Sequence, residues 1–445
     1  CGSGAFPMGI LQKMVHILQK LDPENKVWRE VQLEKARKES EEAFEIEDKK
    51  AREERLLEIN EAFDQSINDP DYARKLFLIE NCIYGVDIQP IAVQISKLRF
   101  FISLVVEQKP SDKPANNFNI RPLPNLETKF VAANTLVGIK KDGGLFETDE
   151  IKKLENELKI VRRKIFSLKS KERKIAWREK DKELREKLST VLKNQGLPLD
   201  AAEKLAKWDP YDQNASSPFF DSEWMFGIKA GFDVVIGNPP YHQLSKDTSA
   251  KQSYKDYLKN KYKTSAGRLN LFIFFTHEAI DLAKKSNGIV SYIIPNTILT
   301  QEYYTDTRKK ILNETSLIKL VDYDEMPFEN AVVENVTFVL KNTRNQNNIV
   351  EVFQDNLIER RQLAIIEQKQ FLLQKNFTFN INSNDLVDEI LANKRHRKLS
   401  TLCEVNQGIA LKGDKSLSLK TSNPENKYYR LLDGRNINKY KIEWE

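Results

Sequence analysis

A short apolar run that ends at two prolines constrains this chain more than any other feature. Residues 232–237, Phe-Asp-Val-Val-Ile-Gly, lead directly into Asn238, Pro239, Pro240 and Tyr241. A run of this length, bounded by glycine and proline, predicts a buried strand that stops abruptly. The prolines fix the backbone of the turn and remove two N–H donors from it. We therefore expect polar chemistry at the carboxyl end of a strand, where open α/β sheets bind their ligands.

Further strands and helices alternate along the chain. This alternation favours an α/β fold with a parallel, doubly wound sheet. Two more strands are expected later, over 332–341 and 348–353, as a possible antiparallel pair across the turn 342–347. The other expected strands are 81–88, 129–133, 288–294 and 318–323, and the expected helices are 1–20, 91–108 (opened by Pro90), 269–283 and 301–313.

Two blocks rich in Glu, Lys and Arg interrupt this pattern. Residues 24–78 predict solvated helix inserted into a domain. Residues 150–192 space their leucines and isoleucines as in a helical hairpin or a short coiled coil. This hairpin is interpreted as a surface projection, with a DNA-contacting arm or a partner-docking coil as the alternatives. We place one domain at 1–355 with helical insertions at 22–78 and 145–205, and a second at 356–445, where periodicity weakens.

Composition excludes several classes of protein. The three cysteines are far apart and the four histidines are scattered, which argues against a disulfide framework and against a metal site. No stretch of 18 apolar residues is present, so no membrane span is expected. No signal peptide is visible, and the expected setting is a reducing cytoplasm. The net charge of +6 permits a polyanionic partner without requiring one.

The Asn-Pro-Pro-Tyr tetrapeptide suits methyl transfer to a planar amino group. The nitrogen of such a group is a poor nucleophile, because its lone pair is delocalised. Two acceptors facing its N–H groups, the Asn238 side-chain oxygen and the Pro239 carbonyl, would localise that pair by positioning and electrostatics. Pro240 would hold the carbonyl rigid, and Tyr241 would offer a face on which a base stacks. The competing interpretation is a Pro-Pro turn whose asparagine caps a loop.

Three further segments suggest a cofactor site. Small residues in Cys1-Gly2-Ser3-Gly4 let the backbone approach a ligand at a helix amino terminus, and Phe6 could pack beside it. Asp87 ends a predicted strand, where a carboxylate can accept hydrogen bonds from ribose hydroxyls, and Ile88 could pack on a base. Asn134, after the next strand, suits an adenine amino group. The alternatives are an ordinary turn, a helix-capping Asp87 and a plain turn residue at Asn134.

These motifs and their order resemble the gamma class of N6-adenine DNA methyltransferases, especially those of type II and type IIG restriction-modification systems. The resemblance extends over about residues 1–340 and includes 224–227, 268–272 and 288–295. It implies a class I, Rossmann-like sheet that binds S-adenosylmethionine, a flipped adenine in double-stranded DNA as the target, and a nuclease domain or subunit outside this chain. The residues implied for catalysis are Asn238, Pro239, Pro240 and Tyr241, and those implied for cofactor binding are Cys1, Gly2, Ser3, Gly4, Phe6, Asp87, Ile88 and Asn134.

The chain's last hundred residues carry a looser resemblance. Residues 406–409 and 429–437 are similar to the start of an α+β target recognition domain, which we expect to be incomplete at Glu445. The resemblance also places Cys1 inside the cofactor motif, so a preceding central strand is expected to be missing. The basic clusters 162–164 and 394–398 are candidates for phosphate contacts or ordinary solvated faces. The rival functions are methylation of cytosine N4 or of a glutamine side chain, and a non-catalytic DNA-binding scaffold.

Overall fold

The computed structural model describes residues 1–108, 110, 118, 120, 124–139, 148–167, 171–263, 269–328, 333–345, 347–381, 401, 437–438 and 441–442. It divides into two units, Cys1–Asn382 and Ser383–Glu445. In the second unit the short strands β9 (Ile437–Asn438) and β10 (Lys441–Ile442) pair antiparallel. The segments 406–409 and 429–436 of the predicted recognition domain, and the basic cluster 394–398, lie outside the described residues.

The first unit begins with four helices, a short strand, another helix and a second short strand. Leu11, Phe100 and Phe130 are fully or almost fully buried where these elements pack together. The predicted helices at 1–20 and after Pro90 are confirmed, the second with proline in its first turn, where its fixed φ is compatible with a helix. The elements are α1 (Ala5–Leu21), α2 (Lys26–Phe44), α3 (Lys49–Asn68), α4 (Pro70–Asn81), β1 (Gly85–Asp87), α5 (Pro90–Val105) and β2 (Phe130–Ala132).

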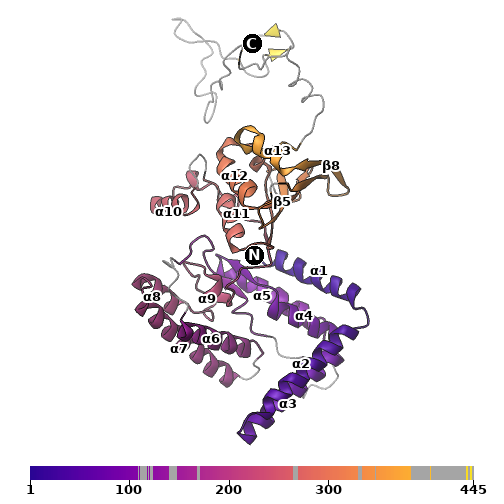
Figure 1. Cartoon of the computed structure of the whole chain (residues 1–445), viewed down its shortest axis with the longest axis vertical. Coiled ribbons are helices and arrows are strands. Elements are labelled where there is room, and N and C mark those ends of the chain that lie inside the picture. Colours follow the sequence, from indigo (N-terminus) through magenta and orange to yellow (C-terminus); the bar gives the residue numbers. More distant parts are fainter. Residues whose placement is uncertain are drawn as a thin grey trace. The chain divides into compact units, whose positions relative to one another are not determined.

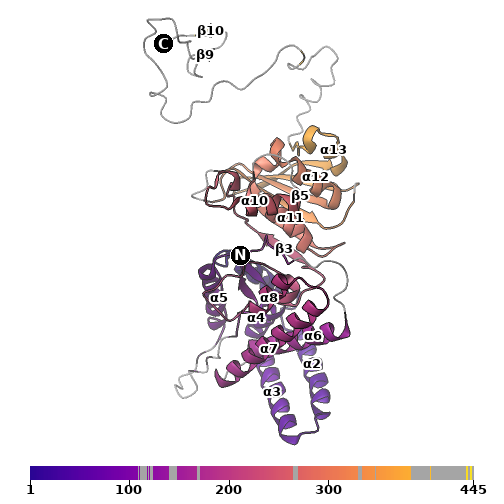
Figure 2. The ribbon, with the colours of Figure 1, turned by 90° about the vertical axis from the view of Figure 1, so that its left-hand side faces the viewer.

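Helices α2 and α3 lie side by side as a hairpin, with most of their side chains in solvent (Figures 1 and 2). The prediction of solvated helix is confirmed for residues 26–68. The prediction does not hold for α4, whose residues Tyr72, Leu78 and Ile79 are buried against the core. Only one side of α4 contacts the rest of the unit. Its few apolar residues are therefore difficult to recognise in a sequence segment that is rich in charged residues.

The second charged block folds as the predicted helical hairpin, formed by α6 (Asp149–Ser167) and α7 (Lys171–Asn194). It is not a surface projection, since one side of α7 is buried against α6, α8 (Leu199–Lys207) and α9 (Ser222–Phe226). Asp181 is fully buried and lies between the guanidinium groups of Arg162 and Arg185. Arg162 therefore has a structural partner, and the interpretation of cluster 162–164 as a solvated face is wrong for this residue.

A six-stranded mixed sheet forms the rest of the first unit, in the order β3-β4-β6-β5-β7-β8. The pairs β3/β4 and β5/β7 are parallel, but β6 runs antiparallel between β4 and β5, so the sheet is mixed and the predicted parallel pairing holds for two of its pairs. The predicted β6–β7 hairpin is wrong, because β5 separates these strands. Their bounds are β3 (Val234–Gly237), β4 (Ile289–Pro295), β5 (Ser316–Tyr323), β6 (Asn335–Lys341), β7 (Ile349–Asp355) and β8 (Arg360–Glu367).

Helices α11 and α12 pack on this sheet (Figures 1 and 2), and their apolar side chains share one core with β4, β5, β6 and β7. The first unit extends beyond the predicted boundary at residue 355, because β8 pairs antiparallel with β7 and Phe371 of α13 joins the same core. The remaining elements are α10 (Gln252–Tyr262), α11 (Leu271–Leu282), α12 (Thr305–Glu314), α13 (Gln368–Leu373) and the 3-10 turns Leu244–Lys246, Asn296–Ile298, Glu302–Tyr304 and Lys375–Phe377.

Strand β3, which carries the tetrapeptide at its end, is less buried than its sequence predicts. Val234 is 53% exposed and Ile236 is 40% exposed. The reason is that, among the described strands, β3 pairs with β4 alone. Strands β1 and β2 pair with each other in parallel. The rings of Tyr84 and Phe232, which precede β1 and β3, lie 6.0 Å apart. Both strands therefore begin at the same aromatic cluster.

The described helices include none with the length and apolar character that a membrane crossing requires.

Candidate active site

The tetrapeptide after β3 is anchored through its last residue. The Tyr241 hydroxyl donates to the carbonyl of Ile293 on β4 at 3.0 Å and accepts from the Asn335 side chain on β6 at 3.2 Å. The Asn270 side chain donates to the backbone carbonyl of Tyr241 at 3.2 Å. Burial raises the pKa of Tyr241 to about 12, so its hydroxyl stays protonated at neutral pH. Three elements thus fix the position of the loop.

The first two residues of the loop present unused acceptors. Asn238 is exposed, and no hydrogen bond to its side chain is found among the described residues. The Pro239 ring is buried, yet no donor in the same part of the chain reaches the Pro239 carbonyl. A rigid loop therefore holds an amide oxygen and a peptide oxygen that are both free to accept. That these two oxygens face an amino-group substrate stays a prediction.

The glycine segment lies at the start of α1 and packs against α5. Gly4 has φ +89°, and a Cβ there would lie 3.0 Å from the Ser96 backbone, so this position requires glycine. The Ser96 hydroxyl donates to the Gly2 carbonyl at 3.1 Å. At Gly2, with φ +56°, a Cβ would meet nothing within 4 Å. The backbone of Gly2 therefore borders open space.

Asp87 joins this glycine turn to α5. Its Oδ2 accepts from the Gly2 N–H at 2.8 Å, and its Oδ1 accepts from the Gln89 N–H at 3.0 Å, just before α5 begins. The carboxylate thus accepts one hydrogen bond from the residue before α5 and one from the glycine turn. Ile88, the next residue, is 58% exposed. The remaining predicted residues of this group, Cys1, Ser3 and Phe6, are half-buried.

Asn134 follows β2, as predicted, but its side chain is engaged within the chain. Its Oδ1 accepts from the Leu136 N–H at 3.2 Å, which is a turn contact, and its Nδ2 donates to the Tyr254 hydroxyl of α10 at 3.5 Å. The same segment approaches the tetrapeptide loop, because Leu136 and Leu244 belong to one apolar cluster.

The structure therefore groups the predicted residues into two sets. Gly2, Gly4 and Asp87 are joined through Ser96 and the start of α1, whereas Asn134 lies beside α10 with the segment that follows Tyr241. Among the described residues, no hydrogen bond links the first set with Asn238–Tyr241. These features fit a ligand that carries both hydroxyl groups and a flat ring. The Asp87 carboxylate could accept from the hydroxyl groups, the exposed Ile88 side chain could cover the ring, and there is open space at Gly2.

Comparison with known proteins identifies the family. Residues 81–328, more than half of the chain, match the model of the Eco57I restriction-modification methylases. The chain belongs to the Eco57I restriction-modification methylase family. The predicted resemblance to methylases of type II restriction-modification systems is confirmed, and so is the α/β class that the resemblance implies. The matched region contains Asp87, Asn134 and the whole tetrapeptide.

Individual relatives of this Eco57I-family chain are distant. RM.MjaORFECS2P of Methanocaldococcus jannaschii is 24% identical over 324 residues, which are 60% of this chain and 26% of that protein. Modification methylase CviBIII of Paramecium bursaria Chlorella virus NC1A is 30% identical over 112 residues, 25% of this chain and 27% of that protein. The chain thus spans about a quarter of the length of these relatives.

Among solved structures, the type IIG restriction endonuclease BpuSI is similar over 57% of this chain and 35% of its own, with 16% identity and a TM-score of 0.29.

Two positioning residues of this family member escape the motif analysis, and a third, Asn270, lies in the noted segment 268–272 without an assigned role. Asn335 is fully buried, Asn270 also caps the start of α11, and Ser96 lies inside an apolar helix. A polar residue at the edge of an apolar strand, as in Asn335-Val336, was the available signal, since a buried amide must find partners. The partner itself, the Tyr241 hydroxyl 94 residues away, cannot be read from that pattern.

Proposed function

We propose that this chain is the catalytic and DNA-recognition part of a site-specific DNA adenine-N6 methyltransferase of a restriction-modification system. The observation that carries the proposal is the rigid loop in which Asn238 and Pro239 keep two acceptors free while Tyr241 is bound to β4 and β6. Membership of a restriction-modification methylase family supports DNA as the substrate.

The loop's chemistry is that of positioning. An adenine N6 amino group placed before Asn238 would donate one N–H to the side-chain oxygen and the other to the Pro239 carbonyl. Both bonds favour a pyramidal nitrogen with a localised lone pair. Preorganised acceptors of this kind act without a strong base, because the amino proton becomes acidic only as the new bond to carbon forms.

S-adenosylmethionine fits the first set of residues, that of Gly2, Gly4 and Asp87, and it would supply an electrophilic methyl group bound to a sulfonium. Asp87 would accept hydrogen bonds from its ribose hydroxyls, Ile88 would cover its base, and the Gly2–Gly4 backbone at the start of α1 would face its amino-acid part. Cys1, Ser3 and Phe6 would line the same space. Asn134 would contact the base after its side chain has left the Leu136 N–H.

Tyr241 would support the target base. Its ring is half-buried and meets Phe272 edge-on at 6.3 Å between centroids, so the ring is held in one orientation. A base can stack there only after leaving the duplex, because its amino group is otherwise paired. Residues 356–445, which we expect to contribute to target recognition, would read the surrounding double-stranded DNA. Any nuclease activity would belong to a domain or subunit outside this chain.

The deciding experiment measures the modified base. Plasmid DNA would be incubated with the protein and labelled S-adenosylmethionine, then digested to nucleosides for mass spectrometry. We expect N6-methyladenine, and Asn238→Ala should lower its formation about 10²–10³-fold, as loss of one preorganised hydrogen-bonding group does elsewhere. Cofactor binding should change little. Asn194→Ala, at an exposed asparagine that ends α7, is the matched control and should leave the activity unchanged.

Other outcomes would redirect the assignment. N4-methylcytosine or a methylated glutamine as the product would refute adenine specificity, and full activity of Asn238→Ala would refute the role of the loop. If S-adenosylmethionine does not bind, the chain has no methyltransferase activity of its own.

A further inference from the structure

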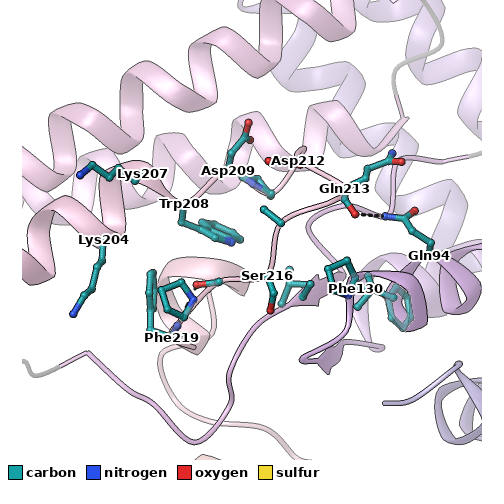
Figure 3. Close-up of a pocket in the computed structure, with 18 of the residues that line it drawn as sticks. Gln94, Phe130, Lys204, Lys207, Trp208, Asp209, Asp212, Gln213, Ser216 and Phe219 are labelled. Atoms are coloured by element: carbon teal, nitrogen blue, oxygen red, sulfur yellow. Dashed lines mark hydrogen bonds between the residues drawn. The ribbon is translucent and has the colours of Figure 1, made fainter. Parts of the chain in front are cut away.

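A pocket of about 230 Å³ lies between the first turns of α5, strand β2 and the segment that follows α8 (Figure 3). The Gln94 side chain donates to the Gln213 carbonyl at 3.4 Å and so joins two of these walls. The volume is below the range of about 300–1,000 Å³ that is usual for sites of drug-sized ligands. A ligand of this pocket would therefore be small.

Lys97 makes this pocket unusual. It lines the pocket, and its side chain is almost entirely buried, with only 6% of the residue exposed. Among the described residues, no hydrogen bond or ion pair reaches its ammonium group. Although Lys97 Nζ has no such partner, it is not completely covered by other atoms. Solvent or a ligand can therefore reach it. Since the pocket is the space that Lys97 lines, we take this as the route. Buried cations are ordinarily paired.

Neighbouring charges neutralise Lys97 only in part. Glu127 acts on it from a distance, but one oxygen of Glu127 binds Arg178 at 3.1 Å, and Arg178 opposes the positive charge of Lys97. At the other side of the pocket, the lysines of α8 already have partners on their own helix. Lys204 pairs with Asp200 at 3.3 Å, and Lys207 pairs with Glu203 at 3.4 Å. Burial lowers the pKa of Lys97, and the attraction of Glu127 offsets this lowering only in part.

The remaining walls combine flat aromatic rings with polar groups, which include the carboxyl groups of Asp209 and Asp212. Trp208, Phe130 and Phe219 are buried and line the pocket, and Figure 3 shows Trp208 beside Ser216 and Phe219. The Arg162 guanidinium lies 5.3 Å from the centre of the Trp208 ring and holds it in place. Aromatic walls of this kind favour another ring, by stacking or by edge-to-face contact.

We propose that this pocket binds a small anion that carries one aromatic ring, with its carboxylate or phosphate on Lys97 and its ring against Trp208 and Phe219. None of the residues proposed for cofactor binding or catalysis lines the pocket. Two of its walls nevertheless lead into that site, since α5 follows Asp87 and Ile88, and β2 precedes Asn134. The bound anion would therefore be placed to influence cofactor affinity from outside the cofactor site.

The test is a binding measurement on the intact protein, independent of methylation. Benzoate and phenyl phosphate would be titrated by calorimetry, with benzamide as the uncharged counterpart of benzoate. We expect saturable binding of at least one anion with one site per chain, and binding of benzamide at least tenfold weaker. A preference between the two anions would distinguish a carboxylate from a phosphate ligand. Absence of saturable binding by both, or equal binding of benzamide, would overturn the proposal.

Variants locate the site. Lys97→Met should weaken binding of the anion at least tenfold and should leave the ligand-free melting temperature unchanged or higher, because it replaces an unpaired buried charge with an apolar chain of similar length. Lys182→Gln, at a lysine of α7 that pairs with Glu179 and does not line the pocket, is the control and should bind within about twofold of the parent. Equal binding by Lys97→Met and the parent would place the anion elsewhere and refute the assignment.

A second measurement needs no variant. An amine-reactive reagent followed by peptide mass spectrometry should modify Lys97, and saturating benzoate or phenyl phosphate should protect it. The exposed lysines should be modified equally with and without the anion. Modification of Lys97 that the anion does not affect would also refute the proposal.

Discussion

Tyr241 has two separable tasks at the proposed active site. Its hydroxyl fixes the loop by contacts with the Ile293 carbonyl and the Asn335 side chain, whereas its ring is the proposed support for the target base. A substitution can remove the first task without the second. This separation allows the roles of anchoring and stacking to be measured independently.

We expect Tyr241→Phe to destabilise the protein by about 1–2 kcal/mol, because it leaves the Asn335 donor without its acceptor inside the core. Binding of DNA with an extrudable adenine should be retained. Tyr241→Ala should in addition lose about 1–3 kcal/mol of base stacking. Urea unfolding and DNA-binding titrations of both variants test this. Equal DNA affinity of Tyr241→Ala and Tyr241→Phe would show that the ring does not stack on the base.

His277 is the residue from which a pH effect on stability is expected. It is buried on α11, and its Nε2 lies 3.0 Å from the Thr307 hydroxyl. Burial lowers the pKa of His277 from 6.5 to about 3, with a smaller contribution from Lys310. The folded protein therefore keeps His277 neutral at pH values where the unfolded chain binds a proton.

The sign follows from this difference. The contribution of neutral His277 is fully present above the unfolded pKa of 6.5, and it is lost as pH falls from 6.5 toward 3. Between pH 7 and pH 5 the free energy of unfolding should decrease by about 2 kcal/mol through this residue. His277→Gln should remove that part of the dependence in urea unfolding, and His16→Gln, at an exposed histidine, should not. An unchanged slope in His277→Gln would contradict the prediction.

At the scale of elements, the α6–α7 hairpin is attached through one buried carboxylate. Asp181 accepts from Arg162 at 2.9 Å and from Arg185 at 2.8 Å. Arg162 also donates to the Trp224 carbonyl of α9 at 2.5 Å, and Arg185 donates to the carbonyls of Ala206 and Trp208 at the end of α8. The two arginines thus connect the hairpin with its neighbours, and they share the Asp181 carboxylate, while Arg185 also lies 3.7 Å from Asp209.

Asp181→Ala should therefore lower the free energy of unfolding by about 3–5 kcal/mol, because it leaves the buried Arg162 guanidinium without a counter-charge and Arg185 with only the half-exposed Asp209 at 3.7 Å. Urea unfolding followed by circular dichroism measures this loss. Glu179→Ala, on the exposed side of the same helix, should change stability by less than about 0.5 kcal/mol. A loss below about 1 kcal/mol in Asp181→Ala would mean that the hairpin is not held by this cluster.

Elements were predictable where their signal is local. The helix opened by Pro90, the α6–α7 hairpin and the strands around Val131, Val235 and Val290 depend on neighbouring residues, and the structure contains each of them. The order of the strands depends on contacts between distant segments. Strand β6 pairs with β4 and β5 rather than with β7, and no residue in the turn 342–347 predicts this pairing.

The same distinction applies to the candidate site. The motif positions Gly2, Asp87 and Asn238 could be predicted because each follows or precedes a recognisable element. The hydrogen bonds that fix them, from Ser96 to Gly2 and from Asn335 to Tyr241, join residues 94 positions apart in each case. Such partners depend on the fold. The engagement of Asn134 with Leu136 and Tyr254 could not be foreseen for the same reason.

At the scale of the whole molecule, the first unit depends on residues beyond the last strand that the sequence analysis assigned to it. Gln368 is fully buried, and its side chain accepts from the Leu317 N–H at 2.8 Å and donates to the Leu312 and Thr315 carbonyls at 3.0 and 2.8 Å. Phe371 and Phe379 are buried in the core that α12 and β5 share. The segment 356–382 is therefore part of the sheet-bearing unit.

Two truncations test where this unit ends. A chain that stops at residue 382 should keep the unfolding midpoint of the first unit, whereas a chain that stops at 355 should not fold. The shorter chain loses β8, the Gln368 contacts and two buried phenylalanines, each worth about 3–5 kcal/mol. That sum is comparable with the whole stability of a domain, about 5–15 kcal/mol. Thermal unfolding followed by circular dichroism would decide. A cooperative transition at an unchanged temperature in the 355-residue chain would show that β8 and α13 are appended to a core that is complete without them.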